Sequence, residues 1–394
     1  MSIDRIEYKK LTIECLSPVH ITDESGAIYS YQLLFEPQAK RIYFLNERLW
    51  VEFLYTHNLL PGFEKLIAGS IKAESVFEWL KAAGITIADL KSIITDSAAV
   101  GVDQRTLQNK RALTEIIRTV HNVDGQPYIP GSSIKGALRN GILYCLLKRQ
   151  EDVRNYAWNR VSKILYDWNV RDKRLELWRL AQNIEIDLLH KLLIPKTRLT
   201  SECIPKTNMI TSIMKGLSIS DSQSEENVRT LIVQKTDVVH EVKTGKFREN
   251  RMMLFRECMP PGTKQSFSIT LDRPIFSSVG INSIQDIIAM QKEYFEDIIK
   301  MQASVFGDTL PEEFLKAHDG TLFIGGGTGF LSKTILAALA PDAESARRAI
   351  AMVLHNNFSK HQHLQLDKLA SPRSVKIART KRFSGFMGLC RIEV

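Results

Sequence analysis

The hydrophobic pattern of this chain changes repeatedly between a period of two residues, which is typical of strands, and a period near 3.6, which is typical of helices. Alternating apolar positions predict strands near residues 6–16, 28–36, 40–45, 228–239, 251–258, 266–272 and 383–394. Helical spacing predicts helices near residues 47–57, 71–83, 150–192, 283–298, 335–339 and 341–358. These elements do not alternate regularly as in a doubly wound sheet, so the pattern predicts the α+β class.

The length of the chain predicts more than one domain, because 394 residues exceed the size at which a single core usually stops growing. We place an N-terminal domain at residues 1–145 and a C-terminal domain, which contains a glycine-rich loop, at residues 228–394. Between them, residues 146–227 are expected to form a helical insertion and a mobile loop. The loop is expected at 218–227, SISDSQSEEN, because this segment is polar and low in hydrophobic residues.

Glycines gather in FIGGGTGFLSKT, residues 323–334, where Gly325, Gly326, Gly327 and Gly329 surround Thr328 and lead to Lys333. Glycine tolerates positive φ and lets another backbone or a phosphate approach closely. Converging N–H groups in such a turn bind anions, and the start of a following helix adds a partial positive charge. The segment therefore predicts a phosphate-binding loop.

Two familiar nucleotide motifs do not fit this loop. The P-loop pattern aligns Gly327 with Lys333 and Thr334, but Ser332 then occupies the place of its second glycine. The dinucleotide pattern G-x-G-x-x-G requires glycine at Phe330 or at Ser332. Two interpretations remain open, a turn needed only for tight packing and a loop that follows a nucleic-acid backbone, and we favour the second.

A second candidate is YIPGSSIKGALR, residues 128–139. Pro130 and Gly131 are expected to turn the chain, and Ser132 or Ser133 to cap the helix that follows. Lys135 and Arg139 are spaced one helical turn apart, beside the buried stripe of that helix. A helix N-terminus, two hydroxyls and two cations together suit a phosphodiester, whereas the simpler interpretation is a capped helix with a solvated basic edge.

The charge of the chain favours a polyanionic partner, since its formal net charge is +9. Basic residues concentrate near the end, at Arg373, Lys376, Arg379, Lys381, Arg382 and Arg391. The five cysteines are scattered without a C-x-x-C pair, which argues against a disulfide framework and a zinc site. Because no signal peptide or bilayer-spanning apolar run is present either, we expect a soluble cytoplasmic protein without a metal or another cofactor.

Four motifs together resemble the RAMP superfamily of CRISPR ribonucleoproteins: PYIPGSSIKGALRN (127–140), ECMPPGT (257–263), IGGGTGFLSKT (324–334) and FMGLCRIEV (386–394). The N-terminal strand that ends at Pro18-Val19-His20 is similar to the opening strand of that family. Within the superfamily, the order of the motifs and the chain length are most similar to the fifth-subunit family of type III-A (Csm) effector complexes. The glycine-rich loop near the C-terminus is the most specific of these motifs.

The resemblance implies two ferredoxin-like, RRM-related domains, at 1–145 and 228–394, that bind single-stranded RNA. It implies a non-catalytic subunit that caps the filament near the 3′ end of the CRISPR RNA (crRNA) and contributes to crRNA maturation and assembly for antiviral defence. The implied partners are crRNA, target RNA and the other Csm subunits, especially the RAMP backbone subunit, with host nucleases as further candidates. By position, the RNA-binding residues are Ser132, Ser133, Lys135, Arg139, Gly325, Gly326, Gly327, Thr328, Gly329 and Lys333.

Some RAMP relatives are ribonucleases, so an endoribonuclease that processes CRISPR precursor RNA is the alternative. His20 and Asp23, in HITDESG, are the weak catalytic candidates, as a base and a metal ligand. His355, His361 and His363 have a spacing that suggests metal ligands, but they lack cysteine or carboxylate neighbours that would close a site. We therefore expect a solvated loop at these histidines and no catalytic site.

Overall fold

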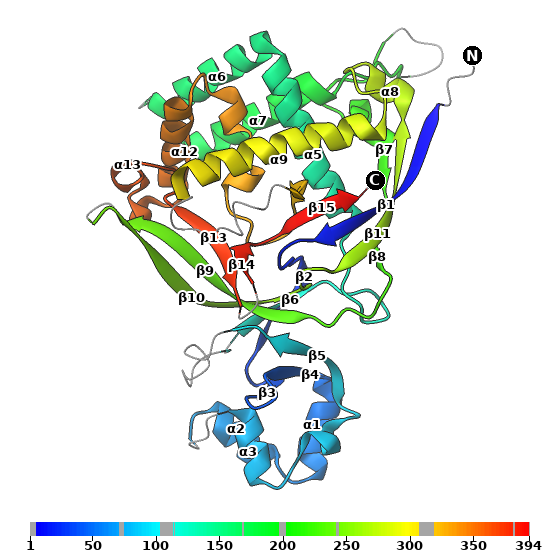
Figure 1. Cartoon of the computed structure of the whole chain (residues 1–394), viewed down its shortest axis with the longest axis vertical. Helices are drawn as coiled ribbons and strands as arrows, with labels where there is room; N and C mark the ends of the chain where they lie inside the picture. The colour runs from blue at the N-terminus through cyan, green and yellow to red at the C-terminus, as the bar shows by residue number, and fades with distance from the viewer. Residues whose placement is uncertain are drawn as a thin grey trace.

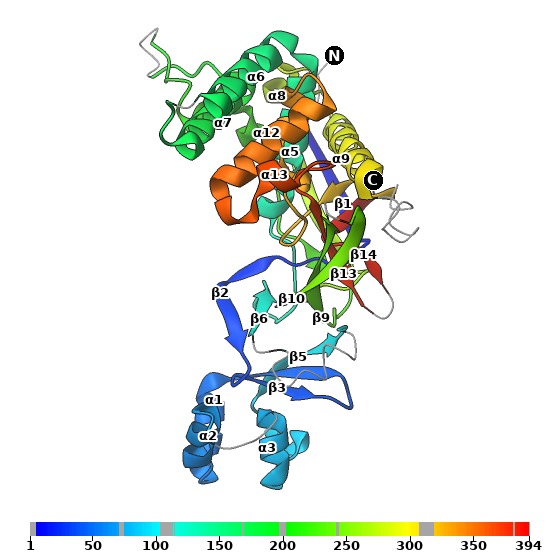
Figure 2. The same ribbon diagram turned by 90° about the vertical axis from the view of Figure 1, so that its left-hand side faces the viewer.

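Two curled β-sheets form the centre of the computed structural model, which also has a helical layer over the first sheet and a small helical lobe attached to the second (Figures 1 and 2). The structure describes residues 5–70, 75–102, 113, 115–167, 169–196, 202–241, 244–306, 319–380 and 383–393. Lys381 and Arg382 of the basic C-terminal segment lie outside these ranges. This mixture of sheets and helices confirms the α+β class.

The first sheet joins the two ends of the chain. Its strands, in spatial order, are β12 (Leu322–Phe323), β15 (Leu389–Glu393), β1 (Ile6–Cys15), β11 (Lys264–Asp272) and β7 (Leu217–Ile219), with β8 (Gln223–Ser224) also on β11. The alternation predicted for the opening strand is confirmed, because Leu11, Ile13 and Cys15 are buried. Antiparallel pairing of β1 with β15 sets Cys15 opposite Cys390, and both thiols are free.

The second sheet also mixes distant parts of the chain. Its strands, in spatial order, are β2 (Thr22–Tyr29), β6 (Glu115–Thr119), β10 (Lys246–Cys258), β9 (Leu231–Glu241), β5 (Ile94–Val100), β4 (Arg41–Leu45) and β3 (Leu33–Glu36). A further strand, β13 (Ser374–Arg379), pairs with β9 and with β14 (Ser384–Phe386). Strands from both sides of the boundaries expected at 145 and 227 therefore share each sheet.

Helices cover the first sheet in two layers. The inner layer consists of α5 (Gly131–Arg149) and α9 (Ile284–Phe306), and the outer layer of α6 (Glu151–Tyr166), α7 (Lys173–Leu189), α11 (Leu336–Leu339) and α12 (Ala343–Asn357) (Figure 1). Two short helices, α8 (Arg273–Ser277) and α13 (His363–Leu366), complete this part. Helix α9 begins where the helical spacing predicts it, and the Ser283 hydroxyl just before it accepts the Asp286 N–H at 3.2 Å.

The small lobe has a hydrophobic core of its own. It contains α1 (Glu47–Thr56), α2 (Leu60–Ile67) and α3 (Val76–Ala82), whose buried residues include Trp50, Leu54, Phe63 and Leu80. Helix α2 was not predicted, although Pro61 stands in its first turn, where proline is favoured. Helix α3 begins later than predicted because Ser75 caps it, while residues 71–74 lie outside the described residues.

The polar segment 218–227 is not a loop throughout, which corrects that expectation. Its ends pair with β11 through β7 and β8. Between them, the buried Ser222 hydroxyl accepts the Ile129 N–H at 2.7 Å, just before α5. The polarity of the segment suggested solvation, whereas its side chains satisfy backbone groups where two elements meet. None of the helices in the described ranges combines the length and the apolar character that a bilayer crossing requires.

Candidate nucleic-acid interface

The glycine-rich loop follows β12 and has the backbone conformation that its sequence predicts. Gly325, Gly327 and Gly329 have φ of +82°, +86° and +88°, a region that residues with a Cβ rarely adopt. The Gly326 N–H donates to the carbonyl of His20 at 2.8 Å, and this contact fixes the loop against the chain after β1. A Cβ on Gly325 would lie 2.1 Å from that carbonyl oxygen, so the close approach itself requires glycine.

The loop and helix α5 meet at one cavity of about 380 Å³. Four of the residues predicted to bind RNA line this cavity: Ser133, Arg139, Gly325 and Lys333. Gln291 and Tyr294 of α9 and Asn140 of α5 also line it, and the sequence did not single them out. Two motifs that lie far apart in the sequence thus form one surface. Ser132 and Lys135 lie on the same first turns of α5 but do not line the cavity.

The three cations of this surface differ in how they are paired. Lys333 Nζ donates to the carbonyl of Gly325 at 2.8 Å, and burial together with the nearby Arg256 lowers its pKa. Arg139 forms an ion pair with Glu185 of α7. Lys135 has no ion pair to a described residue, and burial lowers its pKa. Lys135 and Lys333 are therefore the cations most available to an anion, whereas Arg139 must first leave Glu185.

Two details of the predicted helix ends are wrong. Helix α5 begins with Pro130 as its N-cap and no side-chain cap, so Ser132 and Ser133 do not cap it. Instead the Asp221 carboxylate accepts the Gly131 N–H at 2.7 Å and already supplies the negative charge that a helix N-terminus attracts. After the glycine-rich loop come only a 3₁₀ turn, Leu331–Lys333, and the four-residue α11. Neither is long enough to add a useful helix dipole.

The loop also touches a residue that the sequence analysis missed. Arg256, on β10, places Nη1 2.6 Å from where a Cβ of Gly327 would lie. Thr328 is buried, and its hydroxyl has no hydrogen-bond partner among the described residues. The available signal was the position of Arg256 immediately before the motif ECMPPGT.

His20, a weak catalytic candidate, has both ring nitrogens engaged. Nδ1 donates to the carbonyl of Glu257 at 2.8 Å, which leaves Nε2 to accept from the Thr22 hydroxyl at 3.1 Å. The side chain is fully buried, and this desolvation lowers the pKa of His20 to about 4. Asp23 follows on β2 and is half-buried. The observed geometry makes His20 a support for the glycine-rich loop rather than a base open to substrate.

This buried imidazole predicts a pH-dependent stability. Between the ordinary pKa of 6.5 and the folded value of about 4, the unfolded chain binds a proton that the folded protein does not. The stability that depends on a neutral His20 should therefore be fully present above pH 6.5 and should be lost as the pH drops through this window. Near pH 5 the free energy of unfolding should be lower by about 2 kcal/mol. Urea unfolding across this range measures the loss.

The matched variants are His20→Gln and His57→Gln. His20→Gln should lower the stability near neutral pH, but it should also remove almost one proton from the number taken up on unfolding between pH 6.5 and 4. His57→Gln, at an exposed histidine, should leave the pH dependence of the wild-type protein unchanged. Equal pH dependence in the wild-type protein and His20→Gln would contradict a neutral, buried His20.

Among the described residues, one cluster has the composition of a metal site: Asp96, His121 and Glu257. Arg118 already lies between the two carboxylates, with Nη2 2.8 Å from Asp96 and Nε 2.9 Å from Glu257. A guanidinium therefore already compensates part of this negative charge and occupies the place between the carboxylates. The histidines near the chain end are not a solvated group throughout, because His363 is buried and its Nδ1 lies 2.9 Å from Asp367 Oδ2.

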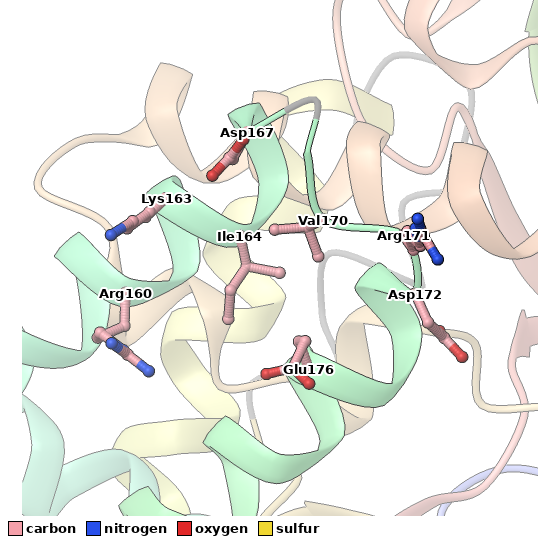
Figure 3. A pocket seen from close by; sticks show the side chains of 8 residues that line it. All are labelled: Arg160, Lys163, Ile164, Asp167, Val170, Arg171, Asp172 and Glu176. Atoms are coloured by element: carbon pink, nitrogen blue, oxygen red, sulfur yellow. The ribbon is translucent and has the colours of Figure 1, made fainter.

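A second pocket, of about 410 Å³, lies between α6 and α7 (Figure 3). Its charged lining residues are three basic ones, Arg160, Lys163 and Arg171, and three acidic ones, Asp167, Asp172 and Glu176. These charges balance, so this pocket lacks the surplus of positive charge that a phosphate backbone needs. The cavity between α5 and the glycine-rich loop is the better candidate.

The fold and this site define the class of the protein. The sequence profile of the RAMP superfamily matches residues 12–332, so the chain belongs to that superfamily. Within it, the chain resembles proteins named CRISPR system Cms protein Csm5. It is 23% identical to the one from Mycobacterium tuberculosis (strain H37Rv), over 98% of this chain and 97% of that protein. It is 22% identical to the one from Streptococcus thermophilus, over 83% and 79%.

Two solved structures have a similar fold. One is a chain in the cryo-EM structure of a Csm–crRNA–target RNA ternary complex of a type III-A CRISPR–Cas system, with a TM-score of 0.64, 17% identity and coverage of 98% of this chain and 100% of that chain. The other is the crystal structure of T. onnurineus Csm5, with a TM-score of 0.56, 18% identity and coverage of 96% and 99%. The resemblance seen in the sequence motifs is therefore confirmed.

Proposed function

We propose that this protein is the RNA-binding Csm5-type subunit of a type III-A Csm effector complex and that it acts without a catalytic site of its own. The observation that carries the proposal is the meeting of α5 and the glycine-rich loop at one cavity lined by Arg139 and Lys333. Backbone N–H groups and cations contact phosphates without reading bases. A subunit that serves every guide sequence needs contacts of this kind.

The more specific roles follow from the same proposal. The subunit caps the filament near the crRNA 3′ end, contacts the RAMP backbone subunit and target RNA, and contributes to crRNA maturation in the cytoplasm, with host nucleases as possible further partners. Its two sheets belong to two ferredoxin-like, RRM-related units. Co-expression with the genomic neighbours tests assembly: the protein should purify in a large complex that holds a short RNA of defined length. A protein that purifies alone would count against the proposal.

The alternative, an endoribonuclease, requires a general base and acid at the scissile phosphate. The engaged nitrogens of His20 do not favour it. Incubating the purified protein with repeat-containing RNA, with and without magnesium, distinguishes the two functions. Specific cleavage that Asp23→Asn abolishes, in a variant that still binds RNA, would establish the ribonuclease.

RNA binding should depend on Lys135 and Lys333 more than on Arg139. Each of Lys135→Gln and Lys333→Gln should weaken binding to the same extent for unrelated sequences and reduce the salt slope by roughly 0.7 for each phosphate that the protein no longer neutralises. Arg139→Gln should have a smaller effect, because its guanidinium exchanges Glu185 for the phosphate. Fluorescence anisotropy with a single-stranded RNA, titrated at several salt concentrations, measures both quantities.

The control is Lys65→Gln, an exposed lysine on α2 of the small lobe, far from the cavity (Figure 1). It removes the same charge from the protein as a whole, so it corrects for the change in net charge. If Lys333→Gln lowered the salt slope no more than Lys65→Gln does, the cavity would not be the RNA site, and the same result for Lys135→Gln would exclude the adjacent first turns of α5.

A further inference from the structure

A strongly basic face lies beside the glycine-rich loop, on the strands β9, β10 and β13. The register places Arg256 opposite Val233 and Lys376 opposite Asp237. Because side chains alternate along a strand, Lys235, two residues from Val233 and from Asp237, shares their face. The side chains of three cations from three adjacent strands, which Figure 1 labels β9, β10 and β13, therefore share one side of the second sheet by register.

The glycine-rich loop packs directly on this face. A Cβ at Gly327 would lie 2.6 Å from Arg256 Nη1, and one at Gly329 would lie 3.6 Å from Lys376 Cγ. Lys333 is near enough to Arg256 for the guanidinium to lower its pKa. The loop therefore connects two positive regions: the cavity beside α5, which Gly325 lines, and the sheet face below Gly327 and Gly329.

Arg256 is the unusual member of this face because it forms no ion pair with any carboxylate in the part of the chain that the structure describes. Its Nε and Nη1 are buried and have no hydrogen-bond partner among the described residues. The adjacent Glu257 points to the opposite face and bonds to Arg118, and Asp237 pairs with Lys376. Lys235 Nζ donates to the sulfur of Met252 at 3.4 Å, which carries no charge to balance it.

Burying a cation without a carboxylate is costly, so a side chain in this position needs another explanation. Burial lowers the pKa of Arg256, and burial and the neighbouring cations lower that of Lys235. Among the described residues, the one carboxylate that pairs with this group of cations, Arg256, Lys235, Lys333 and Lys376, is that of Asp237. A guanidinium donates charge-assisted hydrogen bonds to phosphate oxygens, and the loop above it has the conformation that lets a phosphate approach.

We propose that this face is a second phosphate subsite for single-stranded RNA, in which Arg256 binds a backbone phosphate and Lys235 supplies adjacent charge. The inference deepens the proposed RNA-binding function and rests on it. The RNA backbone then passes from the α5 cavity across the glycine-rich loop to β10. The loop contacts the RNA along its length rather than at one end.

Arg256→Met tests this subsite, since methionine keeps most of the aliphatic stem and removes the charge. Affinity for a mixed-sequence single-stranded RNA should fall roughly tenfold, and the salt slope should fall by about 0.7. The Tm of the RNA-free protein should stay the same or rise, because the variant removes an unpaired buried charge. Affinity is measured well below the thermal transition of each variant, so that all the protein is folded.

The matched control is Arg248→Met on the same strand, an arginine already paired with Glu241, which should leave affinity nearly unchanged. A second arm uses RNA with neutral methylphosphonate linkages, for which wild-type and Arg256→Met proteins should have equal affinity. Unchanged affinity of Arg256→Met for normal RNA, or weaker affinity without a smaller salt slope, would overturn the subsite. So would a lower Tm of the RNA-free variant, since the guanidinium would then stabilise the fold itself.

The outcomes for the two proposals differ. If Lys135→Gln and Lys333→Gln weaken binding while Arg256→Met does not, the second subsite is wrong and the RNA-binding function stands. If the wild-type protein does not bind RNA above the level of a protein of similar charge, the proposed function itself fails.

Discussion

Replacing Glu257 with alanine should lower the free energy of unfolding by about 3–5 kcal/mol, because it leaves the mostly buried Arg118 guanidinium with only the partly exposed Asp96 carboxylate and also removes the acceptor of two buried donors. Glu257 is fully buried and accepts hydrogen bonds from Arg118 Nε at 2.9 Å, the Thr230 hydroxyl at 2.7 Å and the Thr119 N–H at 3.3 Å. These donors come from β6 and from the start of β9, so one carboxylate joins three strands of the second sheet. The Arg118 guanidinium also lies 4.0 Å from the ring of Phe44, which cannot balance its charge as a carboxylate does.

Urea unfolding near neutral pH measures this effect, and Asp96→Ala is the matched control. Asp96 pairs with the same arginine at 2.8 Å, but a third of its side chain, 33%, is exposed, so water can take the place of its carboxylate. We expect Asp96→Ala to cost about 1 kcal/mol. Equal losses in the two variants would show that the buried carboxylate is not the centre of this network.

Glu257 also supports the glycine-rich loop of the proposed RNA site. Its own carbonyl accepts from His20 Nδ1, and the carbonyl of His20 in turn accepts from the Gly326 N–H. The glycine-rich loop therefore rests on a short chain of contacts that begins in the second sheet. A side chain with no access to RNA can in this way determine the position of a loop that we propose binds it.

Local patterns in the sequence predicted the elements whose signals are local. Alternation identified β1, and helical spacing of apolar residues identified α9. The pairing of β1 with β15 was not predictable, because no pattern in a single sequence connects Cys15 with Cys390. The division at residues 145 and 227 followed the order of elements along the chain, whereas the sheets are built from strands at both of its ends.

The site, too, was predictable where its signals are local in the sequence and was missed where it depends on distant residues. The glycine-rich loop and the start of α5 were visible because their motifs are continuous in the sequence. Their meeting at one cavity, the pairing of Arg139 with Glu185 and the unpaired state of Arg256 all depend on residues far away in the chain. The serines at the start of α5 were expected to cap it because they are good capping residues, but they lie within its first turn, and Asp221 from another segment accepts the Gly131 N–H instead.

Alanine substitutions along the glycine-rich loop should have sharply graded effects, with Gly325→Ala the most damaging. Its φ of +82° costs an alanine about 1–2 kcal/mol, and the new Cβ would lie 2.1 Å from a backbone oxygen of His20. The loop has to move, which disturbs the bond from Gly326 to His20 and the carbonyl that holds Lys333. We expect a total loss of about 2–5 kcal/mol of unfolding free energy and RNA binding weaker by at least roughly tenfold.

Two neighbouring glycines separate the causes of that effect. Gly329 has a φ of +88° but no clash, because the added Cβ would lie in ordinary van der Waals contact with Lys376 Cγ at 3.6 Å, so Gly329→Ala should show only the cost of φ, about 1–2 kcal/mol. Gly326 is outside the positive-φ region, and its nearest neighbour is a side-chain atom of His20 at 3.1 Å, so Gly326→Ala should be the mildest. Urea unfolding and RNA anisotropy on all three variants measure the order. If Gly326→Ala weakened RNA binding as much as Gly325→Ala, the close approach to His20 would not be what holds the loop, and the loop would bind RNA through a conformation other than the one seen here.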